Sequence, residues 1–272
     1  MPQTFSRMDA PPVIPATVSS PPPLQVFVVS WTGWHASSLA IATALQPCAD
    51  KVTLVYSDAD DALRLMAPCR TVHTPDGWFF GRKFRTCLDN CDEGVMLVIT
   101  GDVFCQDWPG LVGRCRWAFQ EYENLGVWAP LIDFTSWPLE KTLIGPVAGT
   151  DLSLVVQTDS IVFAMGAEVV SRMKNLNYEE NHYGWGIDWA AMACCYARGM
   201  FAAVDKGIAV RHPAVTTYDN SACIGQMHDF LQQLDDSERI QYLRLQSHLR
   251  HRSGTTLPPG AELPQWSPLS GD

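Results

Sequence analysis

The sequence lacks three features that would place it in a specialised class of protein. It contains no run of about 18 apolar residues, so it offers no candidate for a membrane-spanning helix. It has no excess of positive charge: the formal net charge is −10, which argues against a broad nucleic-acid-binding surface. No two cysteines have the CxxC spacing of a zinc ribbon. The chain is therefore expected to be an ordinary folded protein whose function depends on local groups of residues.

The nine cysteines are an odd number, so they cannot all pair within one chain. We expect buried free thiols, as in a reducing compartment, rather than disulfides. The adjacent Cys194 and Cys195 lie in an apolar helical stretch and are expected to belong to the core. The N-terminus does not resemble a signal peptide, so a cytoplasmic location is the default expectation, and peripheral attachment to a membrane stays open.

Two proline-rich segments flank a central segment of mixed composition. Residues 1–23 and 252–272 are rich in proline and small residues, which predicts a disordered leader and a disordered tail. Residues 24–251 form the globular part, without an internal repeat, and their number fits one domain. A hydrophobic content of 47% and a charged content of 18% are those of a protein with a sizeable core.

Apolar runs alternate with segments of helical spacing in the first half of the globular part. The runs typical of buried parallel strands are 24–30, 51–57 and 94–100, with a shorter candidate at 71–73. The segments with helical spacing are 38–45, 62–66 and 80–91. This alternation predicts a mostly parallel α/β sheet with helices on both faces. Strand-like runs at 126–134 and 152–166 predict a second half around the same sheet, and an amphipathic helix is expected at 229–250.

Charged side chains stand where such a sheet would bind a ligand. Asp58 and Asp102 directly follow buried strands, and ligands of these sheets bind beyond the carboxyl ends of the strands. A carboxylate there can bind a divalent cation that in turn binds a diphosphate, although Gly-Asp is also common in turns. Arg82 and Lys83 lie near the expected start of a helix, where a cation opposes the helix dipole and a bound anion would offset it; solvated surface charge is the alternative.

The segment from Tyr183 to His212 has the most distinctive pattern in the chain. Two glycines flank Trp185, and Asp188 follows at the start of an apolar helix that ends at Gly199. A Gly-Trp-Gly loop allows close backbone approach and the packing of an indole against a ligand. Taken alone, Asp188 has a second explanation as a helix N-cap, and a lone histidine such as His212 is more often structural or solvated than a metal ligand.

This order of features resembles the GT-A class of glycosyltransferases, most nearly its family-2-like and galactosyltransferase-like branches. Many members carry a Gly-Trp-Gly-acidic segment, a helix, a glycine, a strand and then a histidine, much as in 184–212, and an Asp-x-Asp at the end of a buried strand. The resemblance covers roughly residues 24–215. It implies an α/β fold of GT-A type in a single domain, with a mostly parallel central sheet flanked by helices.

The resemblance also implies a role for each matching residue. Asp188 corresponds to the carboxylate that contacts the acceptor hydroxyl and serves as the catalytic base in inverting members, and Trp185 and Gly186 adjoin it on the acceptor side. Asp102 matches the second acidic residue of Asp-x-Asp and, with His212, the ligands of Mn²⁺ or Mg²⁺. The residues implied to bind the donor are Asp58, Arg82, Lys83, Asp102 and Asp159.

The chain departs from the family pattern at Thr100, which stands in place of the first acidic residue of Asp-x-Asp. One carboxylate, one histidine and the donor phosphates can still hold Mg²⁺ or Mn²⁺, because these ions readily keep water ligands. Weaker dependence on a metal is the other outcome that Thr100 allows.

The implied activity is transfer of a sugar from a nucleotide-diphosphate sugar, with a UDP-sugar favoured, to a glycan or lipid-linked acceptor. Inversion at the anomeric carbon and a role in surface glycan synthesis are expected. One alternative is a glycosyltransferase acting on modified nucleic-acid bases, for which basic residues in 244–252 could form a local patch. A second is a nucleotide-sugar-binding protein without activity, which Thr100 favours. A sugar nucleotidyltransferase is disfavoured, because 31–35 lacks the Gly-rich basic loop of that class.

Overall fold

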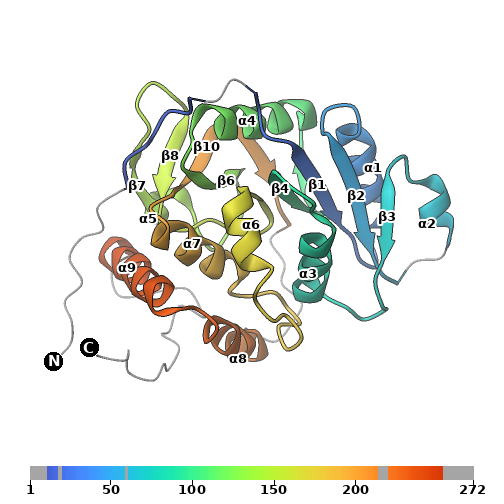
Figure 1. Ribbon diagram of the computed structural model, residues 1–272. Coiled ribbons are helices and arrows are strands. Elements are labelled where there is room, and N and C mark those ends of the chain that lie inside the picture. Colours follow the sequence, from blue (N-terminus) through green and yellow to red (C-terminus); the bar gives the residue numbers. More distant parts are fainter. Residues whose placement is uncertain (1–10, 18–19, 59–60, 214–219, 254–272) are drawn as a thin grey trace.

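The computed structural model of the chain describes residues 11–17, 20–58, 61–213 and 220–253. These residues form one ten-stranded sheet covered by helices (Figure 1). The strands are β1 (Leu24–Val29), β2 (Lys51–Tyr56), β3 (Arg70–His73), β4 (Val95–Thr100), β5 (Phe104–Cys105), β6 (Leu125–Ile132), β7 (Leu143–Pro146), β8 (Leu152–Val155), β9 (Val162–Met165) and β10 (Phe201–Arg211).

The strand order is β3-β2-β1-β4-β9-β6-β10-β8-β7, and β5 pairs with β10. Four neighbouring pairs are parallel: β3/β2, β2/β1, β1/β4 and β6/β10. The inserted β9 is antiparallel to both β4 and β6, and β8 is antiparallel to both β10 and β7. Only β5, β8 and β9 therefore run against the other seven strands. The predicted mostly parallel sheet is confirmed.

The helices lie on both faces of the sheet, as predicted. They are α1 (His35–Leu45), α2 (Asp61–Met66), α3 (Phe80–Asn90), α4 (Trp108–Glu121), α5 (Leu139–Thr142), α6 (Ala167–Met173), α7 (Ile187–Ala197), α8 (Asn220–Leu231) and α9 (Asp236–Ser253). Residues of α3, α6, α7, α8 and α9 form one apolar core with one face of the sheet, and residues of α1, α2 and α4 form a second core with the other (Figure 1). Strands β1 and β4 are buried along their whole length because both of their faces are covered.

The C-terminal helical region differs from its prediction. One helix was expected over 229–250, but α8 ends at Leu231 and α9 begins at Asp236. Asp235 starts the new helix: its Oδ1 accepts from the backbone N of Glu238 at 2.9 Å, and a Glu238 carboxylate oxygen accepts from the backbone N of Asp235 at 3.1 Å. This reciprocal pair is a capping box, and its Asp-x-x-Glu pattern is visible in the sequence.

The predicted leader is partly ordered. Residues 1–10 lie outside the described residues, but Pro15 forms a β-bridge with Tyr122, and Ala16 N donates to the carbonyl of Glu121 at 2.7 Å. The side chain of Asn124 also accepts from Ile14 N at 2.9 Å. Backbone hydrogen bonds to the end of α4 therefore hold a segment whose composition predicted disorder. Of the predicted tail, residues from 254 onward are outside the described part.

All nine cysteines are free thiols, and seven of them are buried. Cys194 and Cys195 are at most 1% exposed inside α7, which confirms them as core residues. Among the described residues, no helix combines the length and the apolar character needed to cross a membrane.

Candidate active site

Polar side chains gather at the carboxyl edge of the parallel strands. Asp58 follows β2, Asp102 follows β4, Asp133 follows β6, and His212 follows β10. These four strands point the same way, so their carboxyl ends meet at one edge of the sheet. The sequence predicted this position for Asp58 and Asp102.

Asp102 and His212 are in contact although 110 positions separate them. His212 Nε2 lies 3.4 Å from Asp102 Oδ2, and the two side chains are only 18% and 14% exposed. Asp133 Oδ1 accepts a hydrogen bond from His212 N at 3.0 Å and so fixes the start of the loop after β10. Burial acts to lower the pKa of His212, but the hydrogen bond and charge of Asp102, with the charges of Asp159 and Asp133, raise it above its usual value.

Three buried polar atoms in this region have no hydrogen-bond partner among the described residues: Asp102 Oδ1, His212 Nδ1 and Thr100 Oγ1. Buried polar atoms are normally paired, and carboxylate, imidazole and hydroxyl groups are ligands that a divalent cation can take. The described residues contain no group of three or more histidine, cysteine, aspartate or glutamate side chains placed to hold a metal ion. Donor phosphates or water would have to complete the coordination shell.

Asp188 lies in the first turn of α7 and is partly exposed. It is not the N-cap, because Gly186 holds that position with a φ of 88°. Asp188 Oδ2 instead accepts from Trp137 Nε1 at 3.2 Å and from Gln157 Nε2 at 3.3 Å. Burial, reinforced by the charge of Asp159, raises the pKa of Asp188 to about 7, although hydrogen bonds from the backbone N of Trp189 and from Trp137 act to lower it. A carboxylate with this pKa is suited to accept a proton near neutral pH.

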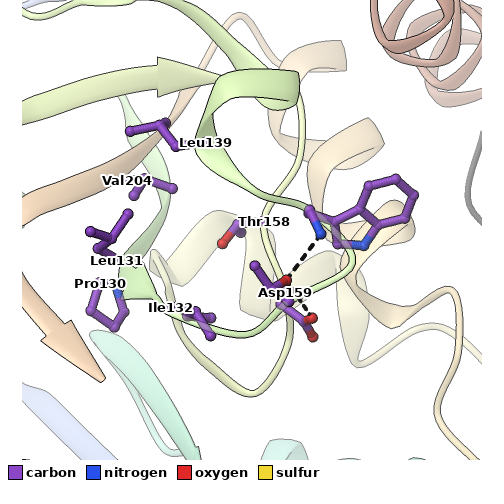
Figure 2. A pocket seen from close by; sticks show the side chains of 9 residues that line it. Pro130, Leu131, Ile132, Leu139, Thr158, Asp159 and Val204 are labelled. Carbon is purple, nitrogen blue, oxygen red and sulfur yellow. Dashed lines mark hydrogen bonds between the residues drawn. The ribbon is translucent and has the colours of Figure 1, made fainter. Parts of the chain in front are cut away.

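Asp159 connects the two groups electrostatically. Its charge raises the pKa values of both Asp188 and His212. Burial raises the pKa of Asp159 itself, although its Oδ2 accepts a hydrogen bond from Thr135 Oγ1 at 2.8 Å. Figure 2 shows Asp159 and Thr158 at the side of a small cavity of about 10 Å³ whose apolar wall includes Leu131. This volume accommodates at most one water molecule, so the cavity itself is no sugar site.

Asp58 and Lys83 form a second polar group at the same edge. Lys83 is fully buried, and its Nζ donates to the carbonyl of Ser30 at 2.7 Å. Burial lowers the pKa of Lys83 to about 8, with the charge of Asp58 acting in the opposite direction. Asp58 has a φ of 57° and accepts hydrogen bonds from Ser57 Oγ at 2.8 Å and Gly77 N at 3.0 Å. Burial acts to raise the pKa of Asp58, but these bonds and Lys83 together lower it.

Arg82 does not join this group. Its Nε and Nη2 donate to the carbonyl of Glu179 at 3.0 and 2.7 Å, and its guanidinium stacks 5.5 Å from the Trp78 ring. The side chain therefore ties α3 to the loop before α7. Of the two neighbouring cations proposed from sequence, only Lys83 faces the strand ends.

The glycines of the Gly-Trp-Gly loop have a structural explanation that differs from the expected approach to a ligand. Both Gly184 and Gly186 have positive φ, at 82° and 88°. A Cβ at Gly184 would lie 2.5 Å from Phe80 Cδ1, and one at Gly186 would lie 2.8 Å from Met227 Cγ. Packing against α3 and α8 therefore requires both glycines. The partly buried Trp185 packs against the same core, and its contact with an acceptor stays a prediction.

Sequence reasoning missed several partners of the candidate residues. Asp133 carried the same signal as Asp58 and Asp102, an aspartate directly after a buried strand. Trp137 and Gln157 carried none, because they lie in loops and reach Asp188 only through the tertiary fold. His35 also joins the edge: its Nδ1 lies 2.8 Å from Ser30 Oγ.

Sheet, helices and strand-end residues together define an α/β fold of GT-A type, as predicted. Solved glycosyltransferases share it. A mannosyltransferase from Pyrobaculum calidifontis in complex with GDP-Man and Mn²⁺ has a TM-score of 0.56 and 12% identity, covering 93% of this chain and 74% of that one. GalNAc-T7 with UDP, GalNAc and Mn²⁺ has a TM-score of 0.58 and 11% identity, covering 85% of this chain and 52% of that one.

A third similar structure is glucosyl-3-phosphoglycerate synthase from Mycobacterium tuberculosis in complex with Mn²⁺, UDP and phosphoglyceric acid. Its TM-score is 0.50 and its identity 13%, covering 84% of this chain and 78% of that one. Identities at this level show the fold alone. A scan against protein-family models and a search of curated proteins find no match.

Proposed function

We propose that the protein is a glycosyltransferase that uses a nucleotide-diphosphate sugar. The observation that carries this proposal is the arrangement at the carboxyl edge of the sheet: the Asp102–His212 pair has unpaired buried atoms, and the charge of Asp159 acts both on His212 and on Asp188, a carboxylate of raised pKa. A site for a cation and a carboxylate of raised pKa are the two elements that transfer from a diphosphate leaving group to a hydroxyl needs.

Asp188 is proposed as the base. It accepts the proton of the acceptor hydroxyl while that oxygen forms a bond to the anomeric carbon, and the bond from this carbon to the diphosphate breaks. Trp137 and Gln157 position the carboxylate through Oδ2. Direct attack of this kind inverts the configuration of the anomeric carbon, which is the proposed stereochemistry. Trp185 and Gly186, immediately before α7, are proposed to border the acceptor.

Asp102 and His212 are proposed to hold Mn²⁺ or Mg²⁺, with Thr100 Oγ1 as a nearby neutral oxygen. A divalent cation there would offset the negative charge that develops on the departing diphosphate. Asp159 is proposed to contact the donor sugar. Asp58 and Lys83 are proposed to shape the nucleoside end of the donor site, and a role of Arg82 there receives no support from its contacts with Glu179.

The substrates are proposed from the resemblance of the sequence and the ligands of the similar structures. Two of those structures contain UDP and one contains GDP-Man, and all three contain Mn²⁺. A UDP-sugar donor and a glycan or lipid-linked acceptor in surface glycan synthesis are the proposed pair, in the cytoplasm or at a membrane surface.

The nucleic-acid alternative has less support from the C-terminal basic residues. Arg252 Nη1 lies 3.2 Å from the carbonyl of Glu140, and His248 Nε2 lies 3.2 Å from the carbonyl of Leu143. These two side chains hold α9 against α5 and β7. The net charge of −10 also argues against binding to nucleic acid.

The test is a panel of UDP- and GDP-sugars incubated with the protein, with and without Mn²⁺. Calorimetry measures binding, and release of the nucleoside diphosphate measures turnover. We expect one donor to bind more tightly with Mn²⁺ and to be consumed slowly by hydrolysis. Binding without any turnover, also in the presence of glycan acceptors, would support a nucleotide-sugar-binding protein without activity. No binding of any donor would overturn the proposal.

A further inference from the structure

A second hollow lies between α4 and the turn that joins β7 to β8, and none of its residues belongs to the proposed active site. Its volume is about 290 Å³, and it is lined by Gly113, Arg114, Trp117, Gly149, Thr150 and Asp151. The smaller cavity beside Asp159 holds only about 10 Å³. The larger hollow is therefore of a size that a small organic ligand can occupy.

The polar side of this hollow is held in place by a buried carboxylate. Asp205 is fully buried and accepts from Arg114 Nε at 2.8 Å and from Arg114 Nη2 at 2.6 Å. Arg114 Nη2 also donates to Asp151 Oδ2 at 3.0 Å. A Cβ at Gly207 would lie 2.2 Å from Arg114 Cζ, so the guanidinium lies flat against β10. Arg114 and Asp151 are thus set in fixed positions, and the Asp151 side chain is 58% exposed.

The other side of the hollow is an indole. Trp117 is 37% exposed, and its ring meets the buried Tyr122 ring edge-on at 6.2 Å and 83°. A Cβ added at Gly113 or at Gly149 would meet no atom within 4 Å, so the space beside the indole is open. One supported aromatic surface therefore stands beside a fixed carboxylate and guanidinium.

We propose that this hollow binds a neutral saccharide. The apolar C–H face of a pyranose can pack on the indole of Trp117, while its hydroxyl groups donate to Asp151 and accept from Arg114. A phosphate is disfavoured, because two carboxylates already offset the charge of Arg114. A quaternary ammonium group is disfavoured, because the lining offers one indole rather than an aromatic cage. The saccharide proposal does not depend on the proposed transferase activity.

The test uses the full chain and three neutral hexasaccharides of different linkage: maltohexaose, cellohexaose and mannohexaose. Binding is measured by calorimetry and by saturation-transfer NMR. We expect at least one hexasaccharide to bind, and Trp117→Ala to weaken that binding by about tenfold or more. Trp117→Tyr, which keeps an aromatic surface, should retain most of the affinity, and Asp151→Asn should lose part of it. Asp188→Asn and Leu65→Ala, a variant of an exposed apolar residue on α2, should bind as the wild type does.

Several results would overturn the saccharide site. These are no binding of any of the three hexasaccharides, unchanged binding by folded Trp117→Ala, or loss of binding in Asp188→Asn, which would place the ligand in the active site. Choline and inorganic phosphate serve as alternative probes. If one of them binds in a way that depends on Trp117 or Arg114 and no hexasaccharide binds, the hollow belongs to a different ligand. If Trp117→Ala fails to fold, two other measurements test the site. These are the hexasaccharide affinity of Asp151→Asn and the change in the tryptophan indole N–H signals of the wild type when hexasaccharide is added.

Discussion

The two polar groups at the carboxyl edge of the sheet differ in how completely the protein satisfies them. Around Asp58 and Lys83, hydrogen bonds from Ser57 and Gly77 and the carbonyl of Ser30 pair the charged atoms. Around Asp102 and His212, buried atoms have no partner among the described residues. Nearby, Asp188 has a pKa raised to about 7. The charged atoms of the first group are thus hydrogen-bonded within the protein, whereas the second group, under the proposed function, exchanges protons and ligands.

This difference has an energetic basis. A buried charge is stable only when it is hydrogen-bonded or paired, so the bond from Lys83 to the carbonyl of Ser30 helps to fix the end of β1 before any ligand arrives. Unpaired buried atoms and a carboxylate of raised pKa lower the stability of the free protein, and such groups cluster at functional sites. Substitutions in the two groups should therefore act on different properties: catalysis and ligand binding in one, folding stability in the other.

The largest effect is expected for Asp188→Asn. The amide oxygen can still accept from Trp137 Nε1, but it cannot take up a proton at neutral pH, so the transfer rate should fall by about 10²- to 10⁴-fold. Donor affinity should stay within about twofold of the wild type, because the change is not in the proposed donor site. Steady-state kinetics and calorimetry check the two quantities separately. Equal losses in donor affinity and rate would assign Asp188 to donor binding instead.

The next largest effect is expected for Asp102→Ala and His212→Ala. Each removes a proposed metal ligand and should weaken Mn²⁺-dependent donor binding by about 100-fold. Donor affinity measured in EDTA should hardly change. Asp92→Ala is a matched control, because Asp92 precedes β4 at the opposite edge and pairs with Lys51. If both variants bind the donor as the wild type does with Mn²⁺, these side chains hold no metal.

Lys83→Met should act mainly on stability. The change leaves the carbonyl of Ser30 without its charged donor and Asp58 without a nearby cation, which should cost about 2 kcal/mol of unfolding free energy. Urea unfolding followed by circular dichroism measures this loss. Arg82→Met is the matched control on the same helix: its side chain is half-exposed, and its loss should be clearly smaller. Equal losses in the two variants would contradict the comparison between the polar groups.

The sheet was predictable because several of its strands have a characteristic local sequence pattern. The runs that became β1, β2 and β4 are mostly apolar, without an alternation of apolar and polar residues, and this pattern indicates burial on both faces. The positions of Asp58 and Asp102 followed from the same rule. The Asp102–His212 contact was expected only through the resemblance, because no local pattern relates two residues from strands that are separated in the sheet by β9 and β6.

The surroundings of Asp188 were beyond the reach of sequence reasoning. Its hydrogen-bond donors come from a loop after β6 and a loop after β8, and their spacing along the chain carries no periodicity. The raised pKa arises from burial and from the charge of Asp159, and both require the tertiary fold. The Gly-Trp-Gly loop shows the opposite case: its pattern is visible in the sequence, packing against α8 accounts for Gly186, and the contact of the loop with an acceptor stays a prediction.

The smallest expected effect separates the two causes of the raised pKa of Asp188. A proposed base must be deprotonated, so activity should rise with pH through about 7. Burial is the larger cause of the raised pKa of Asp188, and the charge of Asp159 adds to it, so Asp159→Asn should move this rise in activity to lower pH by less than the shift that burial causes. Asp159→Asn also removes a negative charge that acts on His212, a proposed metal ligand. The pH profiles of kcat are therefore recorded at saturating Mn²⁺. If the rise of kcat with pH stays at the same pH in Asp159→Asn, or moves to higher pH, Asp159 does not act on the base.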